Sequence, residues 1–202
     1  MDIKLIINKF LHLFEVTRIT TSDRVVYLTF DDGPEGDITD WVLDILKKYD
    51  SKATFFCKGE NAEINKEQLV RIIADGHALG NHTFSHINSF ETPTRSYLED
   101  VEKADNVLHT VLFRPPWGSL TLFTFLRLRK KYKIVYWSLI SGDTEMEKLV
   151  LDSNMQRLYN KTQPGDIVLF HSCIKHENET KRILPLYLEW LKQNGYKTNV
   201  LN

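Results

Sequence analysis

Three segments of the chain carry side chains that can hold a metal ion and move protons. They are the adjacent acids Asp31 and Asp32, the pair His82 and His86, and the distant His171. Two imidazoles and a carboxylate are a common donor set for catalytic zinc, which keeps a fourth position for water. A second carboxylate and a third imidazole would then be free to act as base and acid. The combination indicates a mononuclear hydrolytic metal site.

The spacing of His82 and His86 is the first point in favour of a metal. A single helical turn that starts at the end of a strand would place both imidazoles on one face. Taken alone, such a pair is equally well explained by a structural or surface role. A third, carboxylate donor favours the metal. The chain has 2 cysteines, too few for a cysteine-rich zinc site, so we expect nitrogen and oxygen ligands.

Asp31 and Asp32 follow an apolar run and precede a Gly-Pro turn. In isolation, two such acids would be explained by capping of the turn. Successive side chains of an extended segment point in different directions. One aspartate can therefore bind the metal while its neighbour faces the attacking water.

Composition excludes several other classes of protein. The 202 residues, 42% of them hydrophobic, suit one domain with a substantial core. A formal net charge of -1 offers no general attraction for phosphate backbones, so we expect no nucleic-acid partner. Cys57 and Cys173 are predicted to be free thiols rather than a disulfide scaffold.

The first 16 residues contain apolar positions at helical spacing, interrupted by charged residues. This pattern predicts a helix but neither a secretory signal nor a transmembrane segment. Docking on the domain is favoured over peripheral membrane contact through residues 1–16, which is the alternative. We therefore expect an N-terminal helical extension over 1–20, a catalytic domain over 21–202, and a location that is cytoplasmic or peripheral to the membrane.

Strand-like and helical patterns alternate along the rest of the chain. We expect strands at 24–30, 53–57, 77–81, 111–114, 134–139, 167–171 and 196–200. Helices are expected between them at 38–49, 65–76, 94–110, 120–131, 145–160 and 180–194. Asn65 and Gln68 resemble a capping box at the start of the second helix. The alternation predicts an α/β fold with a parallel sheet, either a barrel or an open doubly wound sheet.

Polar residues at the strand ends favour the barrel. Parallel barrels gather their sites from loops after several strands, whereas open sheets use one or two switch-point loops. Here polar groups follow five of the expected strands, namely Asp31 and Asp32, His82, Arg114, Asp143 and His171.

Four motifs resemble, in order, the signature of the polysaccharide deacetylase family, the NodB-homology enzymes of carbohydrate esterase family four. They lie at 29–34, 82–86, 114–118 and 169–171. The similarity extends from about residue 25 to the C-terminus. Several motifs in the family's order are far more specific than any one of them.

The resemblance implies a distorted, TIM-barrel-like (β/α)7 barrel and a divalent metal, commonly zinc, with cobalt, nickel or iron as alternatives. Carried onto this chain, the metal ligands are Asp32, His82 and His86. The resemblance further implies that Asp31 is the general base, that Arg114 orients it, and that His171 is the general acid. The backbone N–H of Trp117 would help to bind the oxyanion.

The implied activity is metal-dependent hydrolysis of non-peptide carbon-nitrogen bonds. N-acetyl groups would be removed from amino sugars of a polysaccharide, oligosaccharide or glycoconjugate. A bound cation can lower the pKa of water to about 7. Asp31 would take the proton of the attacking water, and His171 would protonate the leaving nitrogen.

The chain departs from the family pattern at three positions. Ile140 replaces an acid, Thr144 an aromatic residue, and Ser172 a common aspartate. Asp143 remains, and it could pair with Arg114, polarise His171 or cap its own loop.

Two other functional hypotheses stay open at this point. The same machinery could cleave O-acetyl esters or non-sugar amides, because motifs fix the reaction and loops fix the substrate. Alternatively, the changed loop after the fifth strand could leave a catalytically silent carbohydrate-binding homologue.

Overall fold

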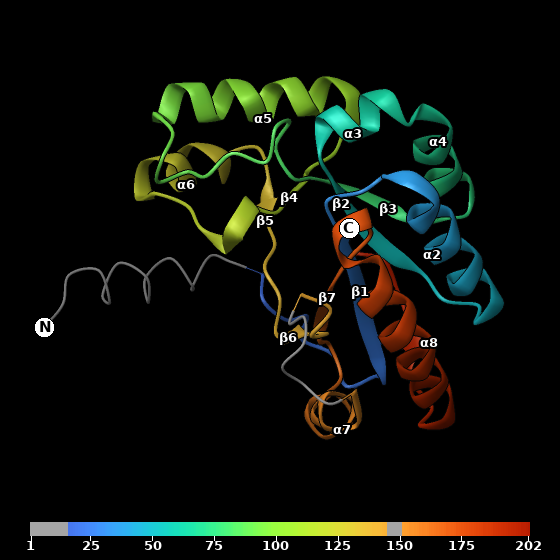
Figure 1. Ribbon diagram of the computed structural model, residues 1–202. Helices are drawn as coiled ribbons and strands as arrows, with labels where there is room; N and C mark the ends of the chain where they lie inside the picture. Colours follow the sequence, from blue (N-terminus) through green and yellow to red (C-terminus); the bar gives the residue numbers. More distant parts are fainter. Residues whose placement is uncertain (1–15, 145–150) are drawn as a thin grey trace, which may run out of the picture.

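The computed structural model describes residues 16–144 and 151–202. Within them, strands and helices alternate along the chain (Figure 1). The elements are β1 Val25–Asp31, α2 Gly36–Lys48, β2 Ala53–Cys57, α3 Gly59–Ile64, α4 Lys66–Ala74, β3 Ala78–Asn81, α5 Thr94–Leu108, β4 Leu112–Phe113, the 3-10 turn η1 Pro116–Gly118, α6 Leu122–Leu128, β5 Lys133–Ile134, β6 Leu139–Ile140, α7 Leu151–Lys161, β7 Ile167–His171, the 3-10 turn η2 Ile174–His176, α8 Glu177–Gln193 and β8 Lys197–Thr198.

The strands of the described residues form one parallel sheet. Its main order is β5-β4-β3-β2-β1-β7-β6, and the short β8 pairs with β1. Every neighbouring pair in this order runs parallel. The main order contains seven strands, which confirms the predicted distorted (β/α)7 barrel. Because all of them run the same way, their carboxyl ends meet at one rim of the sheet.

Strand β1 lies in the interior of the sheet, between β2 and β7. Its apolar residues Val26, Leu28 and Phe30 are fully buried. The Phe30 ring stacks on Phe55 of β2 and on Phe170 of β7, with centroids 5.2 and 5.5 Å apart. This packing makes β1 a rigid support for the acids at its end.

The helices lie around the outside of the curled sheet (Figure 1). Helix α2 shows how its sequence specifies this position, since Ile38, Val42 and Leu46 form one fully buried stripe. The loops at the carboxyl ends of the strands are left at the rim.

One predicted strand, 134–139, is wrong as a single element. This segment forms two short strands instead: β5 pairs with β4, and β6 pairs with β7. The two strands lie at opposite ends of the sheet order. Between them, the carbonyls of Val135 and Tyr136 accept hydrogen bonds from Arg114 at 3.3 and 2.8 Å. A buried guanidinium thus occupies carbonyls that a continuous strand would use for its ladder.

Residues just before β1 also contact this part of the barrel. Val16 forms a parallel bridge with Val135, and Arg18 forms an antiparallel bridge with Asp166. The expected helix over 1–16 lies almost wholly outside the described residues. The domain boundary at residue 20 therefore stays a prediction.

The capping box predicted for Asn65 and Gln68 is wrong. The Asn65 side chain donates to the carbonyls of Pro34 and Asn61. Asn65 is the C-cap of α3, a short helix that the sequence pattern did not predict. Gln68 donates instead to the carbonyl of Gly36. Both amides therefore tie neighbouring segments together rather than cap α4.

The helix predicted over 145–160 is described only from Leu151, as α7. Its first part lies outside the described residues. Within 16–144 and 151–202, none of the helices combines the length and the apolar composition required to cross a bilayer.

Candidate metal centre and active site

The two acids at the end of β1 point in different directions. Asp31 is the last residue of the strand and is only 3% exposed. Asp32 follows with φ 73°, in the left-handed region. The chain therefore turns between them, and the carboxylates reach different partners. This confirms the predicted divergence of the two side chains.

The two histidines come together by a route that differs from the prediction. His82 and His86 lie in an irregular loop after β3, not on a helical turn. Thr83 and His86 have φ values of 63° and 56°. Left-handed residues bend the loop so that the imidazole centroids lie 5.1 Å apart.

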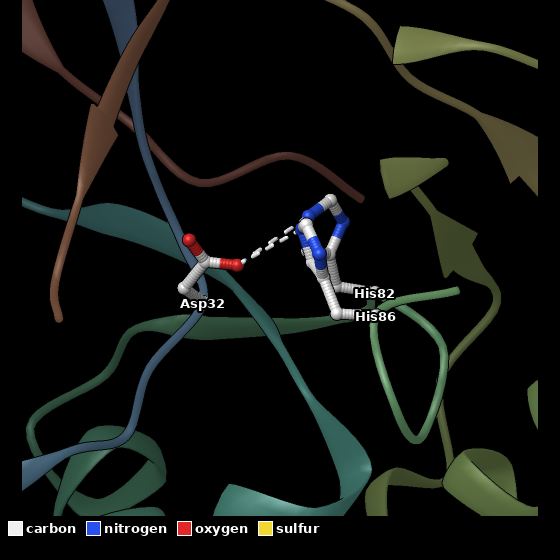
Figure 2. A group of neighbouring side chains, drawn as sticks. All are labelled: Asp32, His82 and His86. Carbon is white, nitrogen blue, oxygen red and sulfur yellow. Dashed lines mark ion pairs between the residues drawn. The ribbon is translucent and has the colours of Figure 1, made fainter. Parts of the chain in front are cut away.

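Asp32, His82 and His86 bring three donor atoms together (Figure 2). Asp32 Oδ1 lies 3.3 Å from His86 Nε2 and 3.8 Å from His82 Nε2. All three donor atoms lie within 4.8 Å of one another. The predicted ligand set is thus assembled from two loops that are about fifty residues apart in the chain.

The protonation of this group suits a cation. His82 Nδ1 lies 2.7 Å from the carbonyl of Arg114, to which it donates, so its Nε2 lone pair faces Asp32. Burial lowers the pKa of His82 to about 3 and also lowers that of His86, which keeps both imidazoles neutral. Asp32 Oδ1 is buried and has no hydrogen-bond donor among the described residues. These donors fit a divalent metal of the zinc type.

Arg114 is fully buried beside this group. Its guanidinium donates to Asp31 Oδ1 at 2.7 Å and to Thr29 Oγ1 at 2.8 Å. Burial raises the pKa of the Asp31 carboxyl, against the opposing charges of Arg114 and His171. A carboxylate held in this way is a stronger base than one in water.

His171, at the end of β7, pairs with Asp143. The His171 Nδ1 lies 3.2 Å from Asp143 Oδ1, and the His171 backbone N–H donates to Asp143 Oδ2 at 2.6 Å. Burial alone would lower the pKa of His171. The hydrogen bond and charge of Asp143, helped by Asp31 and Asp32, raise it instead to about 9.

Of the roles considered for Asp143, polarisation of His171 is the one that fits the geometry. The partner of Arg114 is Asp31 rather than Asp143. Asp143 is fully buried, and Thr180 of α8 donates to its Oδ2 at 3.2 Å. The carboxylate is therefore fixed in its contact with the imidazole.

Trp117 lies at the edge of the site. It is left-handed, with φ 61°, and its ring meets that of His86 edge-on at 5.1 Å between centroids. Its side chain is 67% exposed. The Trp117 ring therefore lies beside one of the two histidine donors.

A cleft of about 340 Å³ joins these groups. The metal-donor candidates and the acid and base candidates line it together with two tryptophans; these residues are Asp32, His82, His86, Asp31, His171, Trp117 and Trp137. Lys175 and His176, which were not predicted as part of the site, also line the cleft.

His77 and His176 are not among the residues that the sequence predicts for the site. The structure confirms this for His77, whose Nδ1 accepts from the Ala53 N–H at 3.2 Å. His176 instead lines the cleft, with its ring centroid 5.0 Å from that of His171. Its position five residues after His171, ahead of a helix, was the signal available in the sequence.

The fold and the site define a class of protein. A parallel barrel gathers polar side chains at its strand ends, and here three nitrogen and oxygen donors that could hold a metal lie beside a further carboxylate and a further imidazole. The family model for polysaccharide deacetylase matches residues 18–136. The chain belongs to the polysaccharide deacetylase family.

Relatives and solved structures extend the match to most of the chain. A peptidoglycan-N-acetylglucosamine deacetylase from Bacillus cereus is 30% identical over 185 residues, covering 89% of this chain and 87% of the relative. The crystal structure of the Bc1960 peptidoglycan N-acetylglucosamine deacetylase superposes with a TM-score of 0.88 and 28% identity, over 96% of this chain and 94% of that one. A CE4 family pseudoenzyme from Bacillus anthracis superposes with a TM-score of 0.74 and 25% identity, over 93% of this chain and 67% of that one.

Proposed function

We propose that this protein is a metal-dependent hydrolase that removes acetyl groups from the N-acetylated amino sugars of a glycan. The observation that carries the proposal is the convergence of three elements on one cleft. These are the Asp32–His82–His86 donor group, the Arg114-held Asp31, and the Asp143-held His171.

The metal would be held by Asp32, His82 and His86. Neutral imidazoles and a carboxylate suit zinc, and they also accept cobalt, nickel or iron. A divalent ion at this position supplies Lewis acidity, which acidifies water and stabilises negative charge on the carbonyl oxygen.

Asp31 is the proposed general base. Its Oδ2 lies 3.8 Å from His82 Nε2, but Asp31 is not among the three residues whose donor atoms all lie within 4.8 Å of one another. Its other oxygen is held by Arg114 at 2.7 Å. The arrangement leaves Oδ2 to accept a proton from the water that attacks the acetyl carbonyl.

His171 is the proposed general acid. With its pKa raised to about 9, the imidazole is protonated at neutral pH. Its Nδ1 is engaged by Asp143, so Nε2 is the atom that would donate to the leaving nitrogen. An amide needs this proton because an unprotonated amine is a poor leaving group.

Trp117 would contribute through its backbone and its ring. Its N–H would donate to the carbonyl oxygen as negative charge develops there, and the loss of one such donor commonly costs about 3–4 kcal/mol of transition-state stabilisation. The rings of Trp117 and Trp137, which line the cleft, would pack on the apolar face of the sugar.

For the substrate, we propose a glycan that contains N-acetylglucosamine. The similarity to a peptidoglycan-N-acetylglucosamine deacetylase over 89% of the chain supports this choice. The small volume of the cleft, about 340 Å³, suits one sugar residue at the reacting position, with neighbouring sugars outside.

The test is acetate release from N-acetylglucosamine oligomers and from peptidoglycan fragments. We expect release from the zinc-loaded protein, loss after chelation and recovery when zinc is returned. Acetyl esters and small amides provide the comparison for the O-deacetylase and amidase alternatives. A silent homologue would release no acetate from any substrate, with or without metal.

Two substitutions at the end of β1 separate the roles within this test. Asp32→Ala should lose bound metal and activity together, because it removes a ligand. Asp31→Asn should retain the metal and lose turnover by about 10²–10⁴-fold, the usual contribution of a general base. Near-native rates for Asp31→Asn would show that the base is another group.

A further inference from the structure

The segment 82–86, called here the ligand loop, carries two of the three proposed metal ligands in an irregular backbone. Thr83 and His86 have φ values of 63° and 56°, and neither is a glycine. Such conformations persist only where the surrounding structure holds them in place. The groups that hold the ligand loop therefore help to set the geometry of the donors.

One side of the ligand loop is held by α3. The N–H of Gly59 donates to the carbonyl of Thr83 at 2.9 Å, and the N–H of Glu60 donates to that of Phe84 at 3.1 Å. These bonds satisfy two of the loop's carbonyls. Its N–H groups need acceptors from elsewhere.

Asp100 on α5 accepts from two of these N–H groups, while those of His82 and Thr83 donate to the carbonyl of Cys57 and to Asn81 Oδ1. The carboxylate of Asp100 accepts through Oδ1 from the N–H of Phe84 at 2.7 Å and from the N–H of Ser85 at 3.1 Å. Its Oδ2 accepts from the Ser85 hydroxyl at 3.0 Å. A single carboxylate thus binds the stretch between the two histidines at three points, and its charge strengthens each bond.

A second residue of α5 contacts the ligand loop. Lys103, three positions after Asp100, places its Nζ 3.5 Å from the centre of the Phe84 ring. Phe84 is itself only 7% exposed. The ligand loop is therefore fixed between α3 and one face of α5.

We propose that Asp100 is a positioning residue for the metal centre, a role that rests on the proposed metal-dependent function. Its three hydrogen bonds hold the ligand loop so that the Nε2 atoms of His82 and His86 face Asp32. Because the ligands are fixed before the metal arrives, the metal binds without the entropic cost of ordering the loop. Asp100 contacts neither the metal donors nor the cleft, so it acts through the loop alone.

The test is zinc affinity, measured by competition with a chromophoric chelator on the folded protein. Asp100→Ala should weaken zinc binding by roughly 10–100-fold, the usual effect of removing a residue that supports metal ligands. Asp100→Asn should fall between this variant and the wild type. Its amide oxygen still accepts the two N–H bonds, but it lacks the charge and cannot accept from the Ser85 hydroxyl.

Glu99→Ala is the matched control. Glu99 is the neighbouring acid on α5, is exposed, and pairs with Arg95 on its own helix at 2.9 Å. It should bind zinc like the wild type. Ser85→Ala removes one of the three bonds, should weaken zinc binding less than Asp100→Ala, and provides the test if Asp100→Ala does not fold.

Wild-type zinc affinity in folded Asp100→Ala would overturn the inference. If Asp100→Ala does not fold, wild-type zinc affinity in both Asp100→Asn and Ser85→Ala would overturn it. So would a lowered melting temperature of the metal-free protein with zinc affinity unchanged, since this marks a purely structural role. Failure of the proposed function looks different: the wild type would bind zinc yet release no acetate. The affinity series would still decide the role of Asp100 in that case.

Discussion

The guanidinium of Arg114 and the carboxylate of Asp31 form a buried ion pair, with Nη1 2.7 Å from Oδ1. The two side chains are 0% and 5% exposed. Arg114 follows β4 and Asp31 ends β1, with β3 and β2 between these strands in the sheet. The pair therefore crosses the interior of the barrel and couples the fold to the site.

Removing Arg114 should damage stability as well as catalysis. Arg114→Ala leaves Asp31 buried without a counter-charge, and breaking a buried pair in this way costs about 3–5 kcal/mol. The expected result is a free energy of unfolding lower by about that amount in urea titration. Arg95→Ala, which breaks an exposed pair with Glu99, should have little effect. Similar stabilities for the two variants would show that the Arg114 pair is not a structural link.

The pH profile of the reaction should depend on Asp143. Because the pKa of His171 is raised to about 9, the acid stays protonated through neutral pH, and the alkaline limb of kcat/KM should fall as the pH rises through that value. Asp143→Asn removes the charge that raises this pKa. The alkaline limb should then move toward neutral pH, and the loss of activity should be larger at pH 8 than at pH 6.

Thr180→Val is the control for this change, because it removes one donor to Asp143 but leaves the carboxylate charge in place. Its alkaline limb should stay close to that of the wild type. An alkaline limb that is unchanged in Asp143→Asn would contradict the assignment of His171 as the acid.

The Trp117 side chain should contribute to the binding of N-acetylglucosamine oligomers, so its removal should change KM. Its ring is 67% exposed beside the cleft, and an aromatic contact with a sugar face is worth about 0.5–1.5 kcal/mol. Trp117→Ala should therefore raise KM for N-acetylglucosamine oligomers by about 2–10-fold. Phe123→Ala, at a ring on α6 that is 74% exposed, should leave KM unchanged. An equal effect of both changes would exclude a specific contact with Trp117.

The sequence was sufficient to predict the fold class and the main residues of the cleft. Periodicity located most strands and helices, and strand-end polarity placed Asp31 and His171 at one rim, as the structure shows. Arg114 is buried behind this rim and is paired with Asp31. These features are local, so they can be recognised without knowledge of the contacts between segments. Their chemical roles stay proposals.

Other features depend on contacts between distant segments and were missed. A four-residue histidine spacing suits both a helical turn and a bent loop, and only the left-handed Thr83 and His86 decide for the loop. Asp100 reaches the ligand loop only after α5 has packed against it. The break between β5 and β6 follows from hydrogen bonds to Arg114, which no local pattern indicates.

The central claim is that Asp32, His82 and His86 bind one metal and leave room for water. Anomalous diffraction from a zinc-soaked crystal tests it most directly. We expect one peak, about 2.0–2.2 Å from Asp32 Oδ1 and from the Nε2 atom of each histidine, with solvent or product acetate at the fourth position. No peak at these three residues, or a fourth protein ligand that closes the site, would contradict the account.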